Sequence, residues 1–163
     1  PPSQKEIVAA FTEPDKGTVV GYSLYNSLKL TTQVAKTIEV LSSEVEQQTK
    51  NISGVLLKSC GLHYTPEVKD VIHMLDVLQN FENIQDLNYH QFISFCKNFA
   101  NSYDESSFER VLQKQRYQKK TISFLRNILD YYDVENSLNK HLSALSEYRH
   151  PTMEGIYESA YPS

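Results

Sequence analysis

The apolar residues between Leu24 and Cys60 recur at alternating spacings of four and three residues. One row consists of Leu24, Thr31, Ile38, Val45 and Ile52, and the other of Val34, Leu41, Gln48 and Val55. This heptad pattern is typical of a helix that packs along a seam. It predicts a helix over about residues 23–60, roughly 55 Å long at 1.5 Å per residue. A helix of that length would impose an elongated shape on the fold.

Capping signals divide the rest of the chain into further helices. Ser3–Glu6 has the S-x-x-E form of a capping box and predicts a short helix over about residues 4–12. Thr65-Pro66 predicts the start of another helix. Together with a second S-x-x-E box at Ser106–Glu109, these signals and the apolar spacing predict helices over about residues 66–83, 87–103 and 107–148. Residues 1–149 would then form a single helical domain, followed by a flexible tail over residues 150–163.

The lengths of these segments predict an all-α fold in one of two forms. Three rods of near-equal length favour an elongated antiparallel three-helix bundle whose middle helix is broken near residues 83–86. Further breaks at Gly54 and Asp133 would instead give a compact bundle of five to six helices. The aromatic stripe from Tyr89 to Tyr103 has the spacing of a buried helix face, so we interpret it as core.

Composition and charge narrow the classes of function. The net charge of −4 argues against nucleic acid as a main partner, because binding to phosphates needs a clustered basic surface. Two cysteines are too few for a disulfide framework, and no signal peptide or long apolar run is present. These features predict a reducing compartment and a cytoplasmic location. Because the chain begins with Pro-Pro, we expect an excised domain.

No motif in the sequence predicts catalysis, a cofactor or a metal site. Cys60-x-x-His63 has the spacing of a metal-ligand pair, but His90 and Cys96 do not repeat that spacing. The five glycines form no phosphate-binding loop, and the carboxylates are scattered along the chain. The sequence therefore predicts a protein that is not an enzyme and binds neither a cofactor nor a metal.

The heptad seam predicts a protein-interaction or assembly module of the adaptor or scaffold type. A partner helix, or a second copy of the chain, would bind along five residues: Ile38, Leu41, Val45, Gln48 and Ile52. Gln48 would set register or partner choice, as polar residues in apolar seams do. Val45-Gln48-Ile52 resembles the central glutamine layer of SNARE-type membrane-fusion bundles. The resemblance covers one helix, and Ser27 and Ser59 depart from it at layer positions.

A basic segment predicts the alternative function, a peripheral membrane-binding module that resembles BAR domains in architecture only. Six of the sixteen basic residues lie between positions 110 and 126. Five of them would form a patch for anionic lipids or an acidic partner: Arg110, Lys114, Arg116, Lys119 and Lys120. In the tail, Tyr157 stands close to acidic residues and is a candidate for phosphorylation.

Overall fold

The chain folds into seven α-helices and one four-stranded sheet, so the all-α bundle predicted from the sequence is wrong. The computed structural model describes residues 1–163. The α-helices are α1 (Gln4–Thr12), α2 (Gly21–Ser27), α3 (Pro66–Gln79), α4 (Tyr89–Asn101), α5 (Glu105–Lys114), α6 (Lys119–Tyr131) and α7 (Met153–Ala160). The strands are β1 (Gly17–Val20), β2 (Ile38–Ser42), β3 (Thr49–Ile52) and β4 (Val55–Ser59), and two short 3₁₀ helices are η1 (Phe81–Asn83) and η2 (Leu138–His141).

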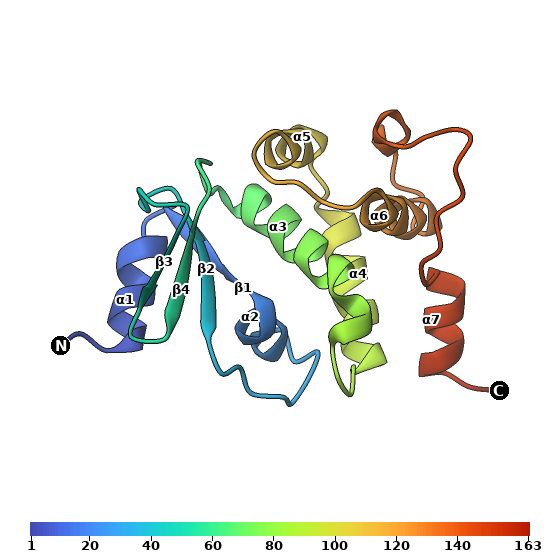
Figure 1. The fold of residues 1–163 in the computed structure, drawn as a ribbon. Coiled ribbons are helices and arrows are strands. Elements are labelled where there is room, and N and C mark those ends of the chain that lie inside the picture. The colour runs from blue at the N-terminus through green and yellow to red at the C-terminus, as the bar shows by residue number, and fades with distance from the viewer.

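The sheet is mixed, with strand order β1-β2-β4-β3 (Figure 1). β2 and β4 run parallel, and Val40 lies opposite Leu57 in their register. The two outer pairs, β1 with β2 and β3 with β4, are antiparallel. Helix α1 covers one face of the sheet, where Ile7 packs with Val40, Val45 and neighbouring strand residues in a small core.

The β3–β4 hairpin turns through two residues with positive φ angles. Ser53 has φ 50° and Gly54 has φ 84°. Two successive positive φ values are the signature of a type I′ turn, whose twist matches that of the flanking strands. The side-chain oxygen of Asn51 also accepts a hydrogen bond from the Gly54 N–H at 3.2 Å. This turn fixes the register of the hairpin.

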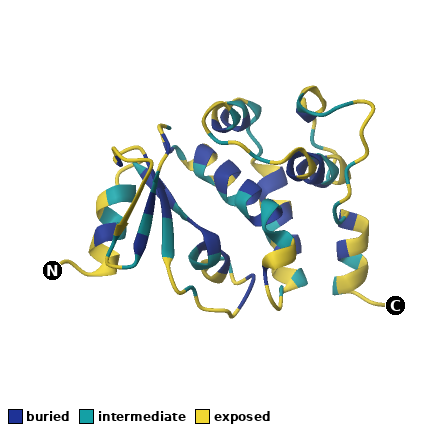
Figure 2. Ribbon diagram, viewed as in Figure 1, coloured by how far each residue is buried: buried dark blue, intermediate teal, exposed yellow.

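The other face of the sheet joins a larger core built mostly from helices. Val20 and Leu41 lie in the same core of 30 buried residues as the inner faces of α3, α4, α5 and α6. Figure 2 shows buried residues concentrated along α3 and α6, with exposed residues at the two ends of the molecule. The fold thus has an N-terminal layer of sheet and two helices beside a C-terminal array of helices (Figure 1). Helix α3 lies at their junction.

The long helix predicted over residues 23–60 is wrong. Its heptad rows are distributed over α2, a loop and three strands. The segment is rich in β-branched residues, and burial alternates along β4, where Val55 and Leu57 are buried and Leu56 and Lys58 are half-buried. A seven-residue repeat therefore arose here from strands that each contribute apolar residues at a period of two. No helical seam exists along these residues.

The predicted helix over residues 107–148 is also wrong, because the chain leaves the helical path twice. Residues 115–118 form an extended linker between α5 and α6. After α6, Asp133 has φ 55° and starts a loop that leads to η2. The predicted flexible tail contains α7, where Met153 and Ile156 are buried against the helical array.

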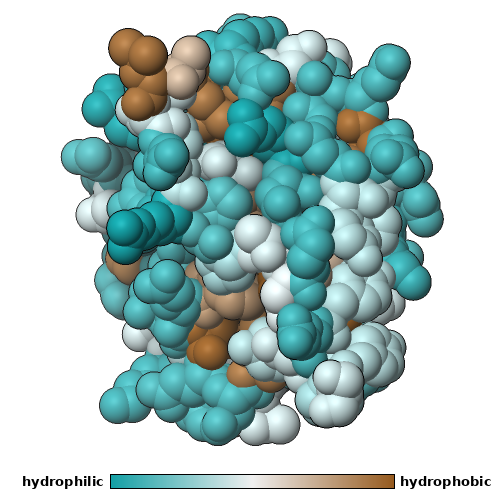
Figure 3. Space-filling model, turned by 90° about the vertical axis from the view of Figure 1, so that its right-hand side faces the viewer, coloured by the Kyte–Doolittle hydropathy of each residue, from teal (hydrophilic) through white to brown (hydrophobic).

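None of the helices combines the length and apolar character needed to cross a membrane. Figure 3 shows the face on the α7 side of the molecule, which is covered mainly by hydrophilic side chains. Hydrophobic residues reach the surface there in separate small areas. This face therefore offers no broad apolar surface.

Candidate functional site

A cavity of about 510 Å³ lies where the N-terminal layer meets α3, and we call it the junction cavity. Residues of all strands contribute to one side, from Val20 on β1 to Ser59 at the end of β4. Helix α3 and the start of α2 form the opposite side, and residues 115–117 of the linker close one end. Ligand sites occur preferentially at such junctions between structural units. The junction cavity is therefore the candidate site.

The polypeptide turns sharply into the cavity at Gly21, where β1 ends and α2 begins. Gly21 has φ 72°, a conformation that glycine adopts without steric cost. Its N–H donates a hydrogen bond to Asp76 Oδ2 on α3 at 2.9 Å. A side chain at this position would clash with Glu39 Oε2 on β2. Two carboxylates from different elements thus meet at the backbone of Gly21.

The two carboxylates differ in their electrostatic surroundings. Glu39 forms an ion pair with Lys58 on the neighbouring parallel strand, with 2.8 Å between Oε1 and Nζ. Asp76 takes part in no ion pair. Burial raises the pKa of the Asp76 carboxyl, although the hydrogen bonds from Gly21 and Tyr25 oppose that rise. Asp76 is therefore a half-buried acid with a raised pKa, which forms no ion pair although the charge of Lys58 acts on it.

The remaining hydrogen-bonding capacity of Asp76 lies on Oδ1. The side-chain nitrogen of Asn80 is 3.5 Å from this oxygen, at the limit of a hydrogen bond. That nitrogen makes its shorter hydrogen bond, at 2.9 Å, to the backbone oxygen of Asp76. Because a carboxylate accepts several hydrogen bonds, Oδ1 retains an unused acceptor position in the wall of the cavity.

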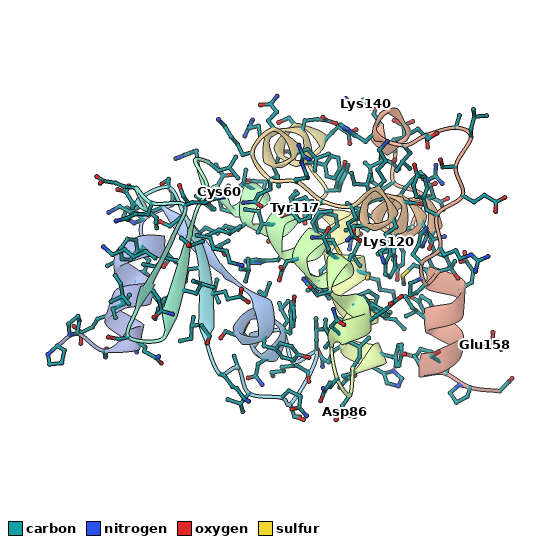
Figure 4. The ribbon with its side chains drawn as sticks, viewed as in Figure 1. Cys60, Asp86, Tyr117, Lys120, Lys140 and Glu158 are labelled. Carbon is teal, nitrogen blue, oxygen red and sulfur yellow. The ribbon has the colours of Figure 1, made fainter.

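Three tyrosines supply aromatic surface and hydroxyl donors to the cavity. Tyr22 and Tyr25 pack edge to face with 5.3 Å between ring centres. Tyr22 donates to the backbone oxygen of Asn83, which ties α2 to η1. Tyr117 enters from the linker, and Figure 4 shows it at α3. Burial raises the pKa of the Tyr25 and Tyr117 hydroxyls, so both remain protonated donors at neutral pH.

The chain matches no family model, no curated protein and no solved structure. The chemistry of the site is therefore inferred from the residues that line it.

The cavity can form hydrogen bonds of both kinds with a polar molecule. Asp76 and Glu39 accept, while side-chain amides, Lys58 and Arg116 donate. The hydroxyls of Tyr22 and Tyr25 already donate to backbone oxygens of the protein. No three His, Cys, Asp or Glu side chains lie close enough together to hold a metal ion. Cys60 and Cys96 are both free and buried.

The structure disperses the five residues of the predicted seam. Leu41 and Val45 are buried, and they belong to different cores on the two sides of the sheet. Ile38 and Ile52 are half-buried and pack against the small core under α1. Gln48 alone is exposed, and it lines the junction cavity. These residues share no helix face, so they form no helical seam, and their role in binding a partner stays a prediction.

The basic residues between positions 110 and 120 are divided among α5, the linker and the start of α6. All five are exposed and none takes part in an ion pair: Arg110, Lys114, Arg116, Lys119 and Lys120. Arg116 lines the junction cavity, whereas Lys120 lines a second cavity on the other side of the linker. Their role in binding lipid or an acidic partner stays a prediction.

Tyr157 lies on α7 and is half-buried. Its hydroxyl is 2.9 Å from the hydroxyl of Tyr132, and its ring stacks on that of Tyr131 with 5.4 Å between centres. The residue therefore holds α7 against the end of α6. Its phosphorylation, which would disrupt this contact, stays a prediction.

Sequence reasoning did not select Asp76, Glu39 or Lys58, which carry most of the charge within the cavity. They come from α3, β2 and β4, and no local spacing connects them. The available signal was that Asp76 is a charged residue within the apolar run of α3, between Leu75 and Val77, which are fully buried. A charged residue at such a position requires a partner or a ligand.

Proposed function

We propose that this protein binds a small polar molecule, bearing hydroxyl or amino groups, in the junction cavity. The observation that carries the proposal is Asp76, a half-buried carboxylate with a raised pKa, no ion-pair partner and one oxygen whose nearest hydrogen-bond donor is at the limit of bonding distance. A hydroxyl or ammonium group of a ligand would supply the missing donor. Charge-assisted hydrogen bonds of this kind are about twice as strong as neutral ones.

The composition of the cavity wall supports a compact polar ligand rather than an apolar one. Of the 17 residues that line the cavity, five are hydrophobic, and the tyrosines among them offer hydroxyl groups as well as ring faces. The acidic Glu39 and Asp76 are matched in number by the basic Lys58 and Arg116, so no strong net charge is demanded of the ligand. Binding of a partner protein or of a membrane, as expected from the sequence, stays a prediction.

The proposal is tested by nuclear magnetic resonance titration with glucose and with glucosamine. The two probes share a hydroxylated ring and differ by one amino group. We expect amide shifts at Gly21 and Asp76, with tighter binding of glucosamine because its ammonium group meets the Asp76 carboxylate. Asp76→Asn should weaken glucosamine binding about tenfold or more, since a hydrogen bond to a charged group contributes about 1.5–3 kcal/mol.

The matched control is Asp70→Asn, the same change on an exposed carboxylate of the same helix that does not line the cavity. This variant should bind glucosamine like the wild type. If both variants weaken glucosamine binding equally, the loss comes from the overall charge of the protein and not from a contact with Asp76, and the proposal is wrong. If neither probe shifts the amide signals around the cavity, the proposal is also wrong.

A further inference from the structure

A second cavity of about 320 Å³ adjoins the junction cavity at the C-terminal end of α3. Gln79, Asn80 and Asn83 line both cavities. The second cavity is completed by residues from the start of α6 and from the segment 149–151. A molecule bound in the junction cavity could therefore extend along these three side chains into the second one.

Two cations from distant parts of the sequence converge on the second cavity. Lys120 comes from the first turn of α6, and Arg149 comes from the segment before α7. Neither side chain forms an ion pair. The one carboxylate in the wall, Glu82, is exposed and also unpaired. Lys120 and Arg149 against Glu82 give the wall a net positive charge.

The segment that carries Arg149 is fixed by the next residue. The Nδ1 atom of His150 is 2.7 Å from the backbone oxygen of Pro151, and its Nε2 atom is 2.9 Å from Ser123 Oγ. The imidazole also stacks on Phe124, with an angle of 9° between the rings. Both ring nitrogens are thus occupied by the protein. His150 therefore positions the backbone of Arg149 rather than contacting a ligand.

The opposite wall is fixed by Gln79. Its Oε1 atom accepts hydrogen bonds from the Gln118 N–H at 2.8 Å and from Thr121 Oγ1 at 3.3 Å. These bonds hold the linker and the start of α6 against α3. The backbone positions of Lys120 and Arg149 are therefore both set by contacts that do not use their charges, which leaves the two charges available for a ligand. Figure 4 shows Lys120 at α6, beside this junction.

We propose that the second cavity binds a phosphate group, and, building on the proposed function, that the small molecule of the junction cavity is phosphorylated. Arginine offers a planar fork of donors that matches phosphate oxygens, and lysine adds a compact charge. A phosphate monoester carries about −1.5 to −2 charges at neutral pH and so responds to two cations more strongly than a carboxylate does. The proposal assigns Lys120 and Arg149 as the binding residues.

The test is a titration of the whole chain with inorganic phosphate at constant ionic strength, followed by amide shifts and by calorimetry. We expect shifts at Lys120, Arg149 and Gln118. Lys120→Gln and Arg149→Gln should each weaken phosphate binding about tenfold. Glu82→Gln should strengthen it, because that variant removes the one opposing charge from the wall.

Lys119→Gln is the matched control, because Lys119 is an exposed neighbour of Lys120 that does not line the cavity. It should retain phosphate affinity within about twofold, as expected of a surface substitution. If Lys119→Gln weakens binding as much as Lys120→Gln, or if phosphate causes no localised shifts in the folded wild type, the proposal is wrong.

Two further arms identify the source of the phosphate and separate this inference from the proposed function. Glycerol 3-phosphate serves as the soluble probe, and vesicles of phosphatidylcholine with phosphatidic acid serve as the lipid probe. If the wild type binds one of these probes and Lys120→Gln and Arg149→Gln do not, the phosphate site is supported. The probe that binds shows whether the phosphate belongs to a soluble ester or to a lipid headgroup. Asp70→Asn, at a carboxylate of α3 that lines neither cavity, should leave inorganic phosphate binding unchanged. Phosphate binding without glucosamine binding would therefore refute the proposed function alone.

Discussion

Replacement of His73 by glutamine should make the protein less sensitive to acid. His73 lies on α3, and its Nε2 atom is 2.7 Å from Thr18 Oγ1 on β1. Burial, reinforced by the nearby charge of Lys69, lowers the pKa of His73 from 6.5 to about 4. The imidazole is thus neutral in the folded protein over a pH range in which the unfolded chain already binds a proton.

The sign and size of the effect follow from this difference in pKa. Above pH 6.5 neither state holds the extra proton, and the full free energy of unfolding is available. As the pH falls from about 6.5 to about 4, the unfolded state binds the proton first and stability is lost. A difference of about 2.5 pH units, at about 1.36 kcal/mol for each, gives a loss of about 3 kcal/mol. A neutral glutamine at position 73 removes this contribution.

Urea unfolding at pH 7 and pH 4 measures the effect as a double difference. Between the two pH values, the wild type should lose about 3 kcal/mol more free energy of unfolding than His73→Gln. Comparison with His63→Gln, which removes an exposed histidine near the start of α3, controls for the general effect of a lost histidine. If His73→Gln loses as much stability as the wild type, the half-buried imidazole of His73 is not the acid-sensitive group and the reasoning fails.

Three other predictions follow from groups described above. Because burial raises the Asp76 pKa, the carboxyl loses its proton at lower pH in the unfolded state than in the folded state. The free energy of unfolding of Asp76→Asn should therefore rise relative to that of the wild type between pH 4 and pH 7. If urea unfolding gives the same difference between the two proteins at both pH values, the prediction is wrong. Gly21→Ala should cost about 1 kcal/mol or more, from its positive φ and the clash with Glu39, whereas Gly61→Ala, with open space around it, should change stability by less than about 0.5 kcal/mol in the same assay. Met153→Ala should lower the free energy of unfolding by about 2–5 kcal/mol, because the fully buried Met153 side chain holds α7 against the other helices. In this variant, hydrogen exchange should show the α7 amides losing protection before those of α3.

Two of the three helix starts that were predicted from capping signals are confirmed. The third, the capping box at Ser106–Glu109, lies inside α5, which is capped by Asp104. Ser3 Oγ accepts a hydrogen bond from the Glu6 N–H at 3.2 Å, as expected of the first capping box. Thr65 caps α3 in the same way through the Val68 N–H, with Pro66 at the first helical position. These signals act within one turn of chain, so they do not depend on tertiary structure.

The sheet was missed because a period of seven was given more weight than the residue types that carry it. Between residues 37 and 59 the chain is rich in isoleucine, valine and threonine, which favour strands. Ser53-Gly54 was interpreted as a weakness in a helix, although a two-residue turn with glycine between apolar runs is a hairpin signal. The parallel pairing of β2 with β4, which places β3 at the edge, has no local signal at all.

The candidate site was even less accessible to sequence reasoning. Gln48 and Arg116 were selected for a helical seam and a basic patch, and both line the junction cavity instead. Asp76 is seen as unusual only when its helix face is known to be buried. The convergence of Glu39, Lys58 and Asp76 depends on how β2, β4 and α3 are packed, and that packing is a property of the whole fold.

The placement of α3 has a consequence for synthesis on the ribosome. All four strands lie within the first 59 residues, yet one face of the sheet, with Val20 and Leu41, is covered partly by a helix that starts at Pro66. A nascent chain that stops before Pro66 would carry all its strands and still expose that apolar face and the β3 edge. Such species attract chaperones or aggregate. We therefore expect fragments that end before α3 to be insoluble. We also expect chaperones to release the N-terminal layer only after the chain has been translated as far as Gln79, the last residue of α3.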